Sequence, residues 1–125
     1  MSVAADGQEL EPDRVAELAE QGKIQLVDVR TDAEYTAGHV AGARHIPFEE
    51  LTARAEELDR SRPLVLYCRS GGRSTAATQA FSASGWEAQS MAGGLVEWAD
   101  RGHPLEPENG HVAETSGLPD QPTST

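Results

Sequence analysis

The sequence predicts an α/β domain: a five-stranded parallel sheet flanked by helices on both faces. Residues 64–67 form a continuous apolar run after Pro63, and residues 24–29 are apolar except for Gln25 and Asp28. Short continuous runs of this kind are typical of parallel strands that are covered on both faces. Segments with helical spacing lie between the strands, and right-handed crossovers through such segments connect parallel strands. A chain of 125 residues supports one core, so we expect a single domain.

The N-terminal part of the chain predicts a strand and a helix before the first long apolar run. Residues 1–7 carry no periodic pattern, and we expect them to be a flexible N-terminus. Residues 8–10 predict a short edge strand. A helix is then expected from residue 11 to Gly22, because a proline suits the first turn and acidic residues are favoured at that end.

The region after the first long run predicts a loop, a short helix and a short strand. An acid within an apolar strand needs a partner, and we expect Asp28 to pair with Arg30 or a nearby backbone N–H and to fix the loop. Residues 31–34 predict a capped helix start and Gly38 its end. Residues 43–46 predict a short strand.

Three further elements follow. Apolar residues recur at spacings of three, four and three over residues 48–58, which predicts a helix with its glutamates facing solvent. A helix rich in small residues is expected after residue 72, packed closely on the sheet through Ala76, Ala77, Ala80, Phe81 and Ala83. Residues 87–91 weakly predict a strand, since only two of them are apolar, and Gly93 and Gly94 predict a tight turn into a last helix.

The central strand ends at Cys68, the only cysteine in the chain. Cys68 therefore lies at the carboxyl edge of the sheet, where open α/β sheets bind their ligands. The glycine pair that follows allows successive backbone N–H groups to point at the sulfur. Those N–H groups, the positive end of a helix expected to begin near Arg73 or Ser74, and two arginines each favour the thiolate over the thiol. The motif reads Cys68-Arg69-Ser70-Gly71-Gly72-Arg73-Ser74.

A lone cysteine is often a small buried hydrophobic residue, and that is the alternative interpretation of Cys68. A packing cysteine does not require two glycines and two arginines around it. The sequence context therefore favours a reactive nucleophile.

Composition excludes several classes of function. The formal net charge of −11 argues against nucleic-acid and anionic-membrane partners. No apolar segment approaches the roughly 20 residues of a membrane span, and the N-terminus lacks the order of a signal peptide. One cysteine forms no intrachain disulfide, and the histidines lack metal-ligand spacing, so we expect a cytoplasmic protein without metal or cofactor.

The cysteine loop resembles the active-site loop of rhodanese-type sulfurtransferases, and three other motifs match that family in the same order. They are Leu26-Val27-Asp28-Val29-Arg30; Glu34-Tyr35 with Gly38-His39-Val40-Ala41-Gly42-Ala43 and Ile46-Pro47; and Gly93-Gly94-Leu95 with Trp98, Gly102 and Pro104. The resemblance spans residues 8–105 and implies the sheet order 1-5-4-2-3. Four residues separate Cys68 from Arg73, whereas the related cysteine phosphatases have five, and this shorter loop suits a single sulfur atom.

The resemblance implies transfer of a sulfane sulfur from thiosulfate or a similar small anionic donor to cyanide or a thiol. It implies that Cys68 is catalytic and carries a persulfide, that Asp28 and Arg30 support the loop, and that Arg69, Ser70, Gly71, Gly72, Arg73 and Ser74 bind substrate. Two alternatives stay open: a sulfur-carrier or interaction module loaded by a protein partner, and a thiol redox sensor. A sensor usually has a resolving cysteine, which this chain lacks.

The C-terminal residues differ in composition from the rest of the chain. From residue 106 onward proline, glycine, serine, threonine and acids predominate, with little apolar content. Such a segment buries too little surface to offset its ordering entropy. We therefore expect residues 106–125 to form a disordered tail.

Overall fold

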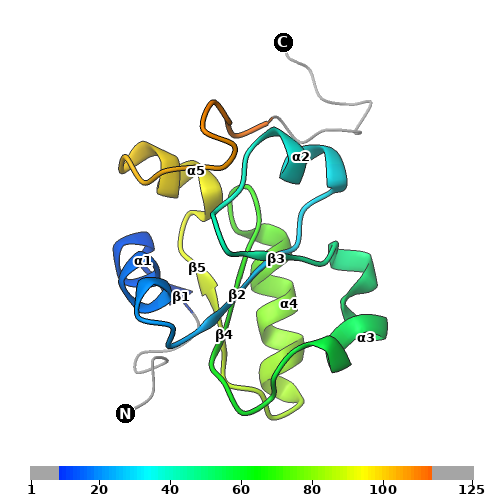
Figure 1. Cartoon of the computed structure of the whole chain (residues 1–125). Coiled ribbons are helices and arrows are strands. Elements are labelled where there is room, and N and C mark those ends of the chain that lie inside the picture. The colour runs from blue at the N-terminus through cyan, green and yellow to red at the C-terminus, as the bar shows by residue number, and fades with distance from the viewer. Residues whose placement is uncertain (1–8, 114–125) are drawn as a thin grey trace.

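A five-stranded parallel sheet forms the centre of the computed structural model, which describes residues 9–113. Its order is β1-β5-β4-β2-β3, and every pair of neighbouring strands is parallel, which confirms the predicted topology (Figure 1). The strands are β1 (Glu9–Leu10), β2 (Gln25–Asp28), β3 (Arg44–His45), β4 (Leu64–Tyr67) and β5 (Ala88–Met91). Residues 1–7 and 114–125, predicted to be flexible, lie outside the described residues.

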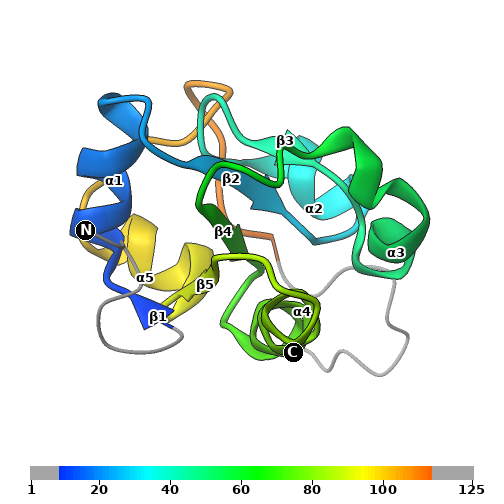
Figure 2. The ribbon, with the colours of Figure 1, turned by 90° about the horizontal axis from the view of Figure 1, so that it is seen from below.

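Helices cover the sheet on two sides (Figure 2). They are α1 (Pro12–Glu20), α2 (Asp32–Ala37), α3 (Leu51–Arg54), α4 (Gly72–Ala83) and α5 (Gly94–Asp100), with the 3₁₀ turns η1 (Phe48–Glu50) and η2 (Ala55–Glu57) on either side of α3. Figure 2 shows α1 and α5 on one side of the sheet and α3 and α4 on the other. No helix in residues 9–113 is long and apolar enough to cross a membrane.

Each face of the central strand contributes to a different apolar core. Val65 and Tyr67 pack in the core below α1 and α5, whereas Leu64, Leu66 and Cys68 pack in the core below α4. All five side chains are at most 2% exposed. Because successive side chains of a strand point to opposite faces, this alternation follows from β4 being covered on both sides, as its sequence predicts.

The rotation of α4 about its axis differs from the sequence expectation. The predicted contact face consisted of Ala76, Ala77, Ala80, Phe81 and Ala83. In the structure the buried residues are Ser74, Ala77, Thr78 and Phe81, while Ala76, Ala80 and Ala83 are exposed. Ser74, Ala77, Thr78 and Phe81 recur at spacings of three, one and three and so lie on one face of the helix, where Ala77 and Phe81 pack in the apolar core and Ser74 bonds to Ser90 on β5.

The predicted helix over residues 48–58 is broken into three short pieces. Only its middle part, α3, is α-helical, and 3₁₀ turns form both ends, with Leu58 N–H donating to the Ala55 carbonyl. The tighter turns change the spacing of the side chains. As a result Leu51 and Leu58 are buried, but Phe48 is 39% exposed.

Residues 106–113, named here the C-terminal segment, have a defined course where the sequence predicts a disordered tail. Glu106 and His39 form an antiparallel bridge, and His111 N–H donates to the Ala37 carbonyl at 2.9 Å. Figure 1 shows this orange segment passing beside α2. Backbone hydrogen bonds to the α2 region therefore offset the ordering cost that the composition suggested.

Candidate active site

The loop from β4 to α4 encloses the Cys68 sulfur with backbone donors. Gly71 N–H donates to Sγ at 3.0 Å and Ser74 N–H at 3.5 Å, and Cys68 is 2% exposed. Gly71 has φ +124°, a conformation that suits glycine, and α4 begins directly after it at Gly72, earlier than the expected start at Arg73 or Ser74. The sulfur therefore lies at the positive end of a twelve-residue helix.

A serine hydroxyl completes the surroundings of the sulfur. Ser74 Oγ lies 3.5 Å from Cys68 Sγ and is also 2.7 Å from the hydroxyl of Ser90 on β5. Both serines are buried, at 0% and 1% exposure. The sulfur thus faces two amides that donate to it and one hydroxyl that accepts from the thiol and can donate to a thiolate, and donors of this kind favour negative charge.

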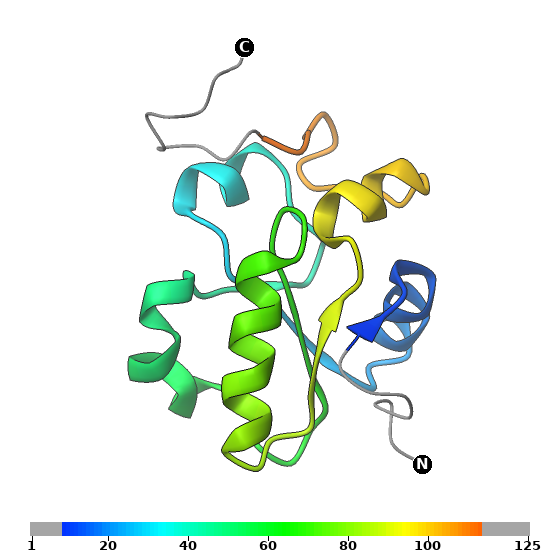
Figure 3. The same cartoon turned by 180° about the vertical axis from the view of Figure 1, so that it is seen from behind.

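The turn before α5 supports the same loop from the other side (Figure 3). Leu95 N–H donates to the Cys68 carbonyl at 2.9 Å, and Val96 N–H donates to the Arg69 carbonyl at 3.0 Å. Gly94 makes this approach possible, since a Cβ built there would lie 2.5 Å from the Arg69 carbonyl oxygen. Two helix N-termini therefore meet at the cysteine loop: one faces the sulfur and one holds the backbone.

Arg73 is held by a carboxylate from a distant part of the chain. Its two terminal nitrogens donate to Glu34 at 2.9 and 3.1 Å, and the Glu34 side chain is fully buried. Burial by itself would raise the pKa of Glu34, but the bonds from Arg73 and from Thr31 outweigh it and hold the pKa below 4.5. The contacts with Glu34 raise the pKa of Arg73, and the nearby Cys68 sulfur adds to that effect.

Arg69 contacts the C-terminal segment. Its Nε donates to the Ala113 carbonyl at 3.0 Å, and the residue is half-buried. The C-terminal segment is therefore connected both to α2 and to the cysteine loop.

The predicted pair Asp28 and Arg30 forms a buried ion pair below the loop. Arg30 Nη2 donates to Asp28 Oδ2 at 2.7 Å, Arg30 N–H donates to Oδ1 at 2.9 Å, and both side chains are 0% exposed. Arg30 also donates to the Gly38 carbonyl and lies 5.7 Å from the centre of the Tyr67 ring. Both predicted forms of pairing, with Arg30 and with a backbone N–H, are present and connect β2 to the end of α2.

The structure brings most of the predicted site residues to one edge of the sheet. Gly71, Arg73 and Ser74 surround Cys68, whereas Ser70 and Gly72 lie on the exposed side of the loop. Sequence reasoning missed the contacts of Glu34 and Ser90. In the sequence, Glu34 belongs to a helix-capping pattern and to one of the motifs that match the family, and neither indicates a contact with Arg73. Ser90 is a polar residue in a weakly predicted strand, and polar residues in a strand that is buried are the signal that indicates such a contact.

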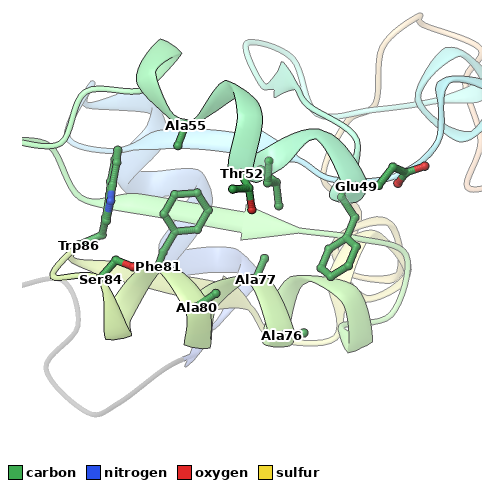
Figure 4. Close-up of a pocket in the computed structure, with 11 residues that line it drawn as sticks. Glu49, Thr52, Ala55, Ala76, Ala77, Ala80, Phe81, Ser84 and Trp86 are labelled. Carbon is green, nitrogen blue, oxygen red and sulfur yellow. The ribbon is translucent and has the colours of Figure 1, made fainter.

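An apolar pocket of about 390 Å³ lies between α4 and residues 48–55, away from the sulfur (Figure 4). Phe48, Thr52, Ala76, Ala80 and Phe81 are among the residues that line it. Cys68 is not part of its lining. Ala76 and Ala80, two exposed small side chains of α4, line the pocket opposite η1 and α3.

The fold and the loop define a class of protein: a parallel α/β domain with a single cysteine whose sulfur accepts two backbone N–H groups at the carboxyl edge of the sheet. The family model for the rhodanese-like domain matches residues 11–101. The chain therefore belongs to the rhodanese-like domain family.

Several curated proteins are similar to this chain. YqhL of Bacillus subtilis is 38% identical over 80 residues, which cover 63% of this chain and 64% of the relative. A sulfurtransferase of Allochromatium vinosum is 35% identical over 89 residues, covering 70% of this chain and 83% of the relative. The probable adenylyltransferase/sulfurtransferase MoeZ of Mycobacterium tuberculosis is 35% identical over 106 residues, covering 81% of this chain but only 27% of the relative.

Solved structures share the fold. A rhodanese-related protein from Thermoplasma volcanium superposes with a TM-score of 0.74 and 26% sequence identity, covering 78% of this chain and 96% of that chain. Together with the named relatives, this similarity supports a sulfurtransferase in general, without indicating its donor or acceptor.

Proposed function

We propose that this protein transfers a sulfane sulfur from thiosulfate or a similar donor to cyanide or a thiol, through a persulfide on Cys68. The observation that carries the proposal is the position of the sulfur, which accepts N–H groups at 3.0 and 3.5 Å at the start of α4. Those donors stabilise a thiolate, and a thiolate is the nucleophile that sulfur transfer needs. A reducing compartment, the cytoplasm, keeps this lone cysteine in the reduced state.

In the first step the Cys68 thiolate attacks the outer, sulfane sulfur of thiosulfate. A new S–S bond forms to Cys68 while the bond between the two sulfurs of the donor breaks, and sulfite leaves with that electron pair. The terminal sulfur of the persulfide then carries the negative charge. Loop N–H groups stabilise this anion, as oxyanion-hole donors stabilise a developing charge.

In the second step an acceptor removes the outer sulfur. Cyanide or a thiolate attacks it, the bond to Cys68 Sγ breaks, and the electron pair returns to Sγ as thiolate. The products are thiocyanate, or the persulfide of the acceptor thiol. No other group of the protein changes its oxidation state.

Arg69 and Arg73 are proposed to bind the anionic end of the donor. Arg73 is suited to this role because Glu34 fixes its guanidinium at two points while its side chain remains 30% exposed. Arg69 is half-buried, with its Nε on the Ala113 carbonyl, and is proposed to turn toward the donor when the donor binds. Ser70 and Gly72 are exposed and give the loop surface that the donor contacts.

The second candidate is a sulfur-carrier module that is loaded by a protein partner. The matching part of this chain corresponds to only 27% of MoeZ, so a similar domain occurs as part of a longer protein. That observation favours exchange of the persulfide sulfur with a protein partner. Both candidates use the same Cys68 chemistry and differ in the donor and acceptor.

Intact-mass measurement tests the proposal directly. Incubation with thiosulfate is expected to add the mass of one sulfur atom, which cyanide or dithiothreitol then removes. The chain has one cysteine, so the added mass is assigned to Cys68, and Cys68→Ser is expected to gain none. Failure of the wild-type protein to gain sulfur from thiosulfate, mercaptopyruvate and a cysteine-desulfurase persulfide would contradict the proposal.

Donor comparison separates the two candidates. Rapid loading by thiosulfate, with steady-state thiocyanate production, supports the small-molecule enzyme. Loading only by a desulfurase persulfide, with slow thiosulfate turnover, supports the protein-loaded carrier. The Cys68→Ser variant serves as the blank in both assays.

A further inference from the structure

A buried pair of hydroxyls connects β5 to the cysteine. In the sheet register Ser90 lies opposite Leu66 of β4, and Leu66 and Cys68 are on the same face of that strand. Ser90 therefore points to the α4 side of the sheet, where its Oγ is 2.7 Å from Ser74 Oγ. Ser74 Oγ in turn is 3.5 Å from Cys68 Sγ.

The protons of these groups limit which hydrogen bonds exist together. The Ser74 hydroxyl donates to the Gly71 carbonyl at 3.3 Å, shares a hydrogen bond with Ser90 Oγ at 2.7 Å, and accepts one from the protonated Cys68 thiol at 3.5 Å. Once the cysteine is a thiolate, Sγ has no proton and the Ser74 hydroxyl can donate to it instead. If Ser74 donates to Ser90, its proton is not available to the sulfur. If Ser90 donates to Ser74, the Ser74 proton can turn from the Gly71 carbonyl to a Cys68 thiolate, which is the stronger acceptor because it is charged, and the two hydroxyls polarise each other.

We propose that Ser90 is a positioning residue: its hydroxyl donates a hydrogen bond to Ser74 Oγ and thereby directs the Ser74 hydroxyl to the Cys68 thiolate. The sulfur then has three donors, the amides of Gly71 and Ser74 and the hydroxyl of Ser74. Ser90 itself does not touch the reacting atoms. This inference rests on the proposed role of Cys68 as a nucleophile, although it concerns the reactivity of the free cysteine before any donor binds.

The chain offers a matched control on the same helix face. Thr78 follows Ser74 by one turn of α4, is 0% exposed, and its hydroxyl has no hydrogen-bond partner among the described residues. Thr78→Val removes a buried hydroxyl of similar burial without changing the sulfur surroundings. It separates the loss of a specific hydrogen bond from the loss of any buried polar group.

The test is the rate of Cys68 alkylation by iodoacetamide as a function of pH. This measurement needs no sulfur donor, and alkylation is confined to one residue because the chain has a single cysteine. Ser90→Ala is expected to move the midpoint of the profile to higher pH and to slow alkylation at neutral pH by roughly twofold to tenfold, the usual effect of one hydrogen bond. Thr78→Val is expected to follow the wild-type profile.

Two further variants decide whether Ser90 acts through Ser74. Ser74→Ala combined with Ser90→Ala is expected to be no slower than Ser74→Ala alone, because the pair acts as one unit. Ser90→Thr keeps the hydroxyl and is expected to restore the wild-type midpoint. Thermal unfolding of each variant confirms that it is folded at the assay temperature.

An unchanged profile for Ser90→Ala would overturn the inference. The inference would also be overturned if Ser90→Ala slowed Cys68 alkylation as much in the Ser74→Ala background as in wild type. A Ser90→Thr variant with the same pH profile as Ser90→Ala would overturn it as well. A shifted profile in a protein that never gains sulfur supports the role of Ser90 while the sulfurtransferase proposal fails. The two ideas are therefore tested separately.

Discussion

The Arg73 guanidinium and the buried Glu34 carboxylate form a two-point ion pair, with distances of 2.9 and 3.1 Å, between residues 39 positions apart. Glu34 also accepts hydrogen bonds from the backbone N–H and the hydroxyl of Thr31. The same carboxylate therefore caps the N-terminus of α2 and holds Arg73 in the first turn of α4. Figure 3 shows α2 and the loop before α4 at the same end of the molecule. The capping pattern of one helix is therefore part of the candidate active site.

Glu34→Gln is expected to destabilise the protein at neutral pH by about 1–3 kcal/mol, the usual worth of hydrogen bonds to a charged group. The folded protein holds the pKa of Glu34 below its ordinary 4.5, so ionised Glu34 contributes stability above that pH and loses it as the pH falls through the lowered value. The difference in unfolding free energy between wild type and variant should therefore shrink below pH 4.5. Urea denaturation across this range measures it.

Glu56→Gln is the control for that series, because Glu56 is exposed. The difference in unfolding free energy between Glu56→Gln and wild type is expected to be small at all pH values. A Glu34→Gln difference that stays constant from neutral to acidic pH would show that the carboxylate charge is not what stabilises the fold.

Gly94→Ala is expected to separate α5 from the cysteine loop. The new Cβ would lie 2.5 Å from the Arg69 carbonyl oxygen and 2.7 Å from the Cys68 carbonyl oxygen, and these are backbone atoms that cannot turn away. Gly102→Ala also places alanine at positive φ, but nothing lies within 4 Å of its Cβ. Gly102→Ala should lower the free energy of unfolding by about 1 kcal/mol through the backbone conformation alone. Gly94→Ala should lower it clearly more, because its Cβ also meets the loop carbonyls.

The same pair of variants should differ in the reactivity of Cys68. Gly94→Ala displaces the carbonyls that accept Leu95 and Val96 N–H, and the loop moves with them. Iodoacetamide alkylation at neutral pH should change in Gly94→Ala and not in Gly102→Ala. Equal alkylation rates in both variants would mean that the α5 contact does not position the loop.

Tyr67→Phe removes the acceptor of a buried backbone group. The Tyr67 hydroxyl accepts Val40 N–H at 3.0 Å, and burial raises the pKa of Tyr67 well above 10, so the hydroxyl remains protonated. The variant leaves that N–H unsatisfied and should lose about 1–3 kcal/mol of stability. Urea denaturation is the measurement.

The control is Tyr35→Phe. The Tyr35 ring stacks on His39 and His45, and phenylalanine keeps that stacking surface. We expect Tyr35→Phe to lose less than half of the unfolding free energy that Tyr67→Phe loses. A Tyr67→Phe protein as stable as wild type would contradict the assigned hydrogen bond.

Gly38→Ala is expected to release the C-terminal segment. A Cβ on Gly38 would lie 2.7 Å from the His111 backbone nitrogen, while the Gly38 backbone is extended and accepts alanine. Hydrogen exchange at Glu106 and His111 should become faster. The substitution should also release Arg69 from Ala113.

Gly42→Ala is the control for this variant, because nothing lies within 4 Å of its Cβ. It should lower overall stability slightly through its positive φ without selective exchange at residues 106–113. Unchanged exchange in Gly38→Ala would mean that the segment is not held by packing against Gly38.

The apolar patterns of the sequence predicted the sheet because they express local and periodic requirements. The run at residues 64–67 and the capping box at Thr31 and Glu34 need no distant partner to be recognised. The loop after Cys68 was also recognisable, since its glycines allow a backbone that few other residues adopt. These features follow from the sequence alone.

Tertiary structure alone decided which distant groups meet the loop. The pairing of Glu34 with Arg73, the contact of Ser90 with Ser74 and the docking of the C-terminal segment depend on strand register and helix rotation. Ser74 shows this most clearly: it faces the sheet and bonds to Ser90, although the alanine pattern of α4 suggested another face. Periodicity identifies an element, but contacts between elements determine which of its residues face the site.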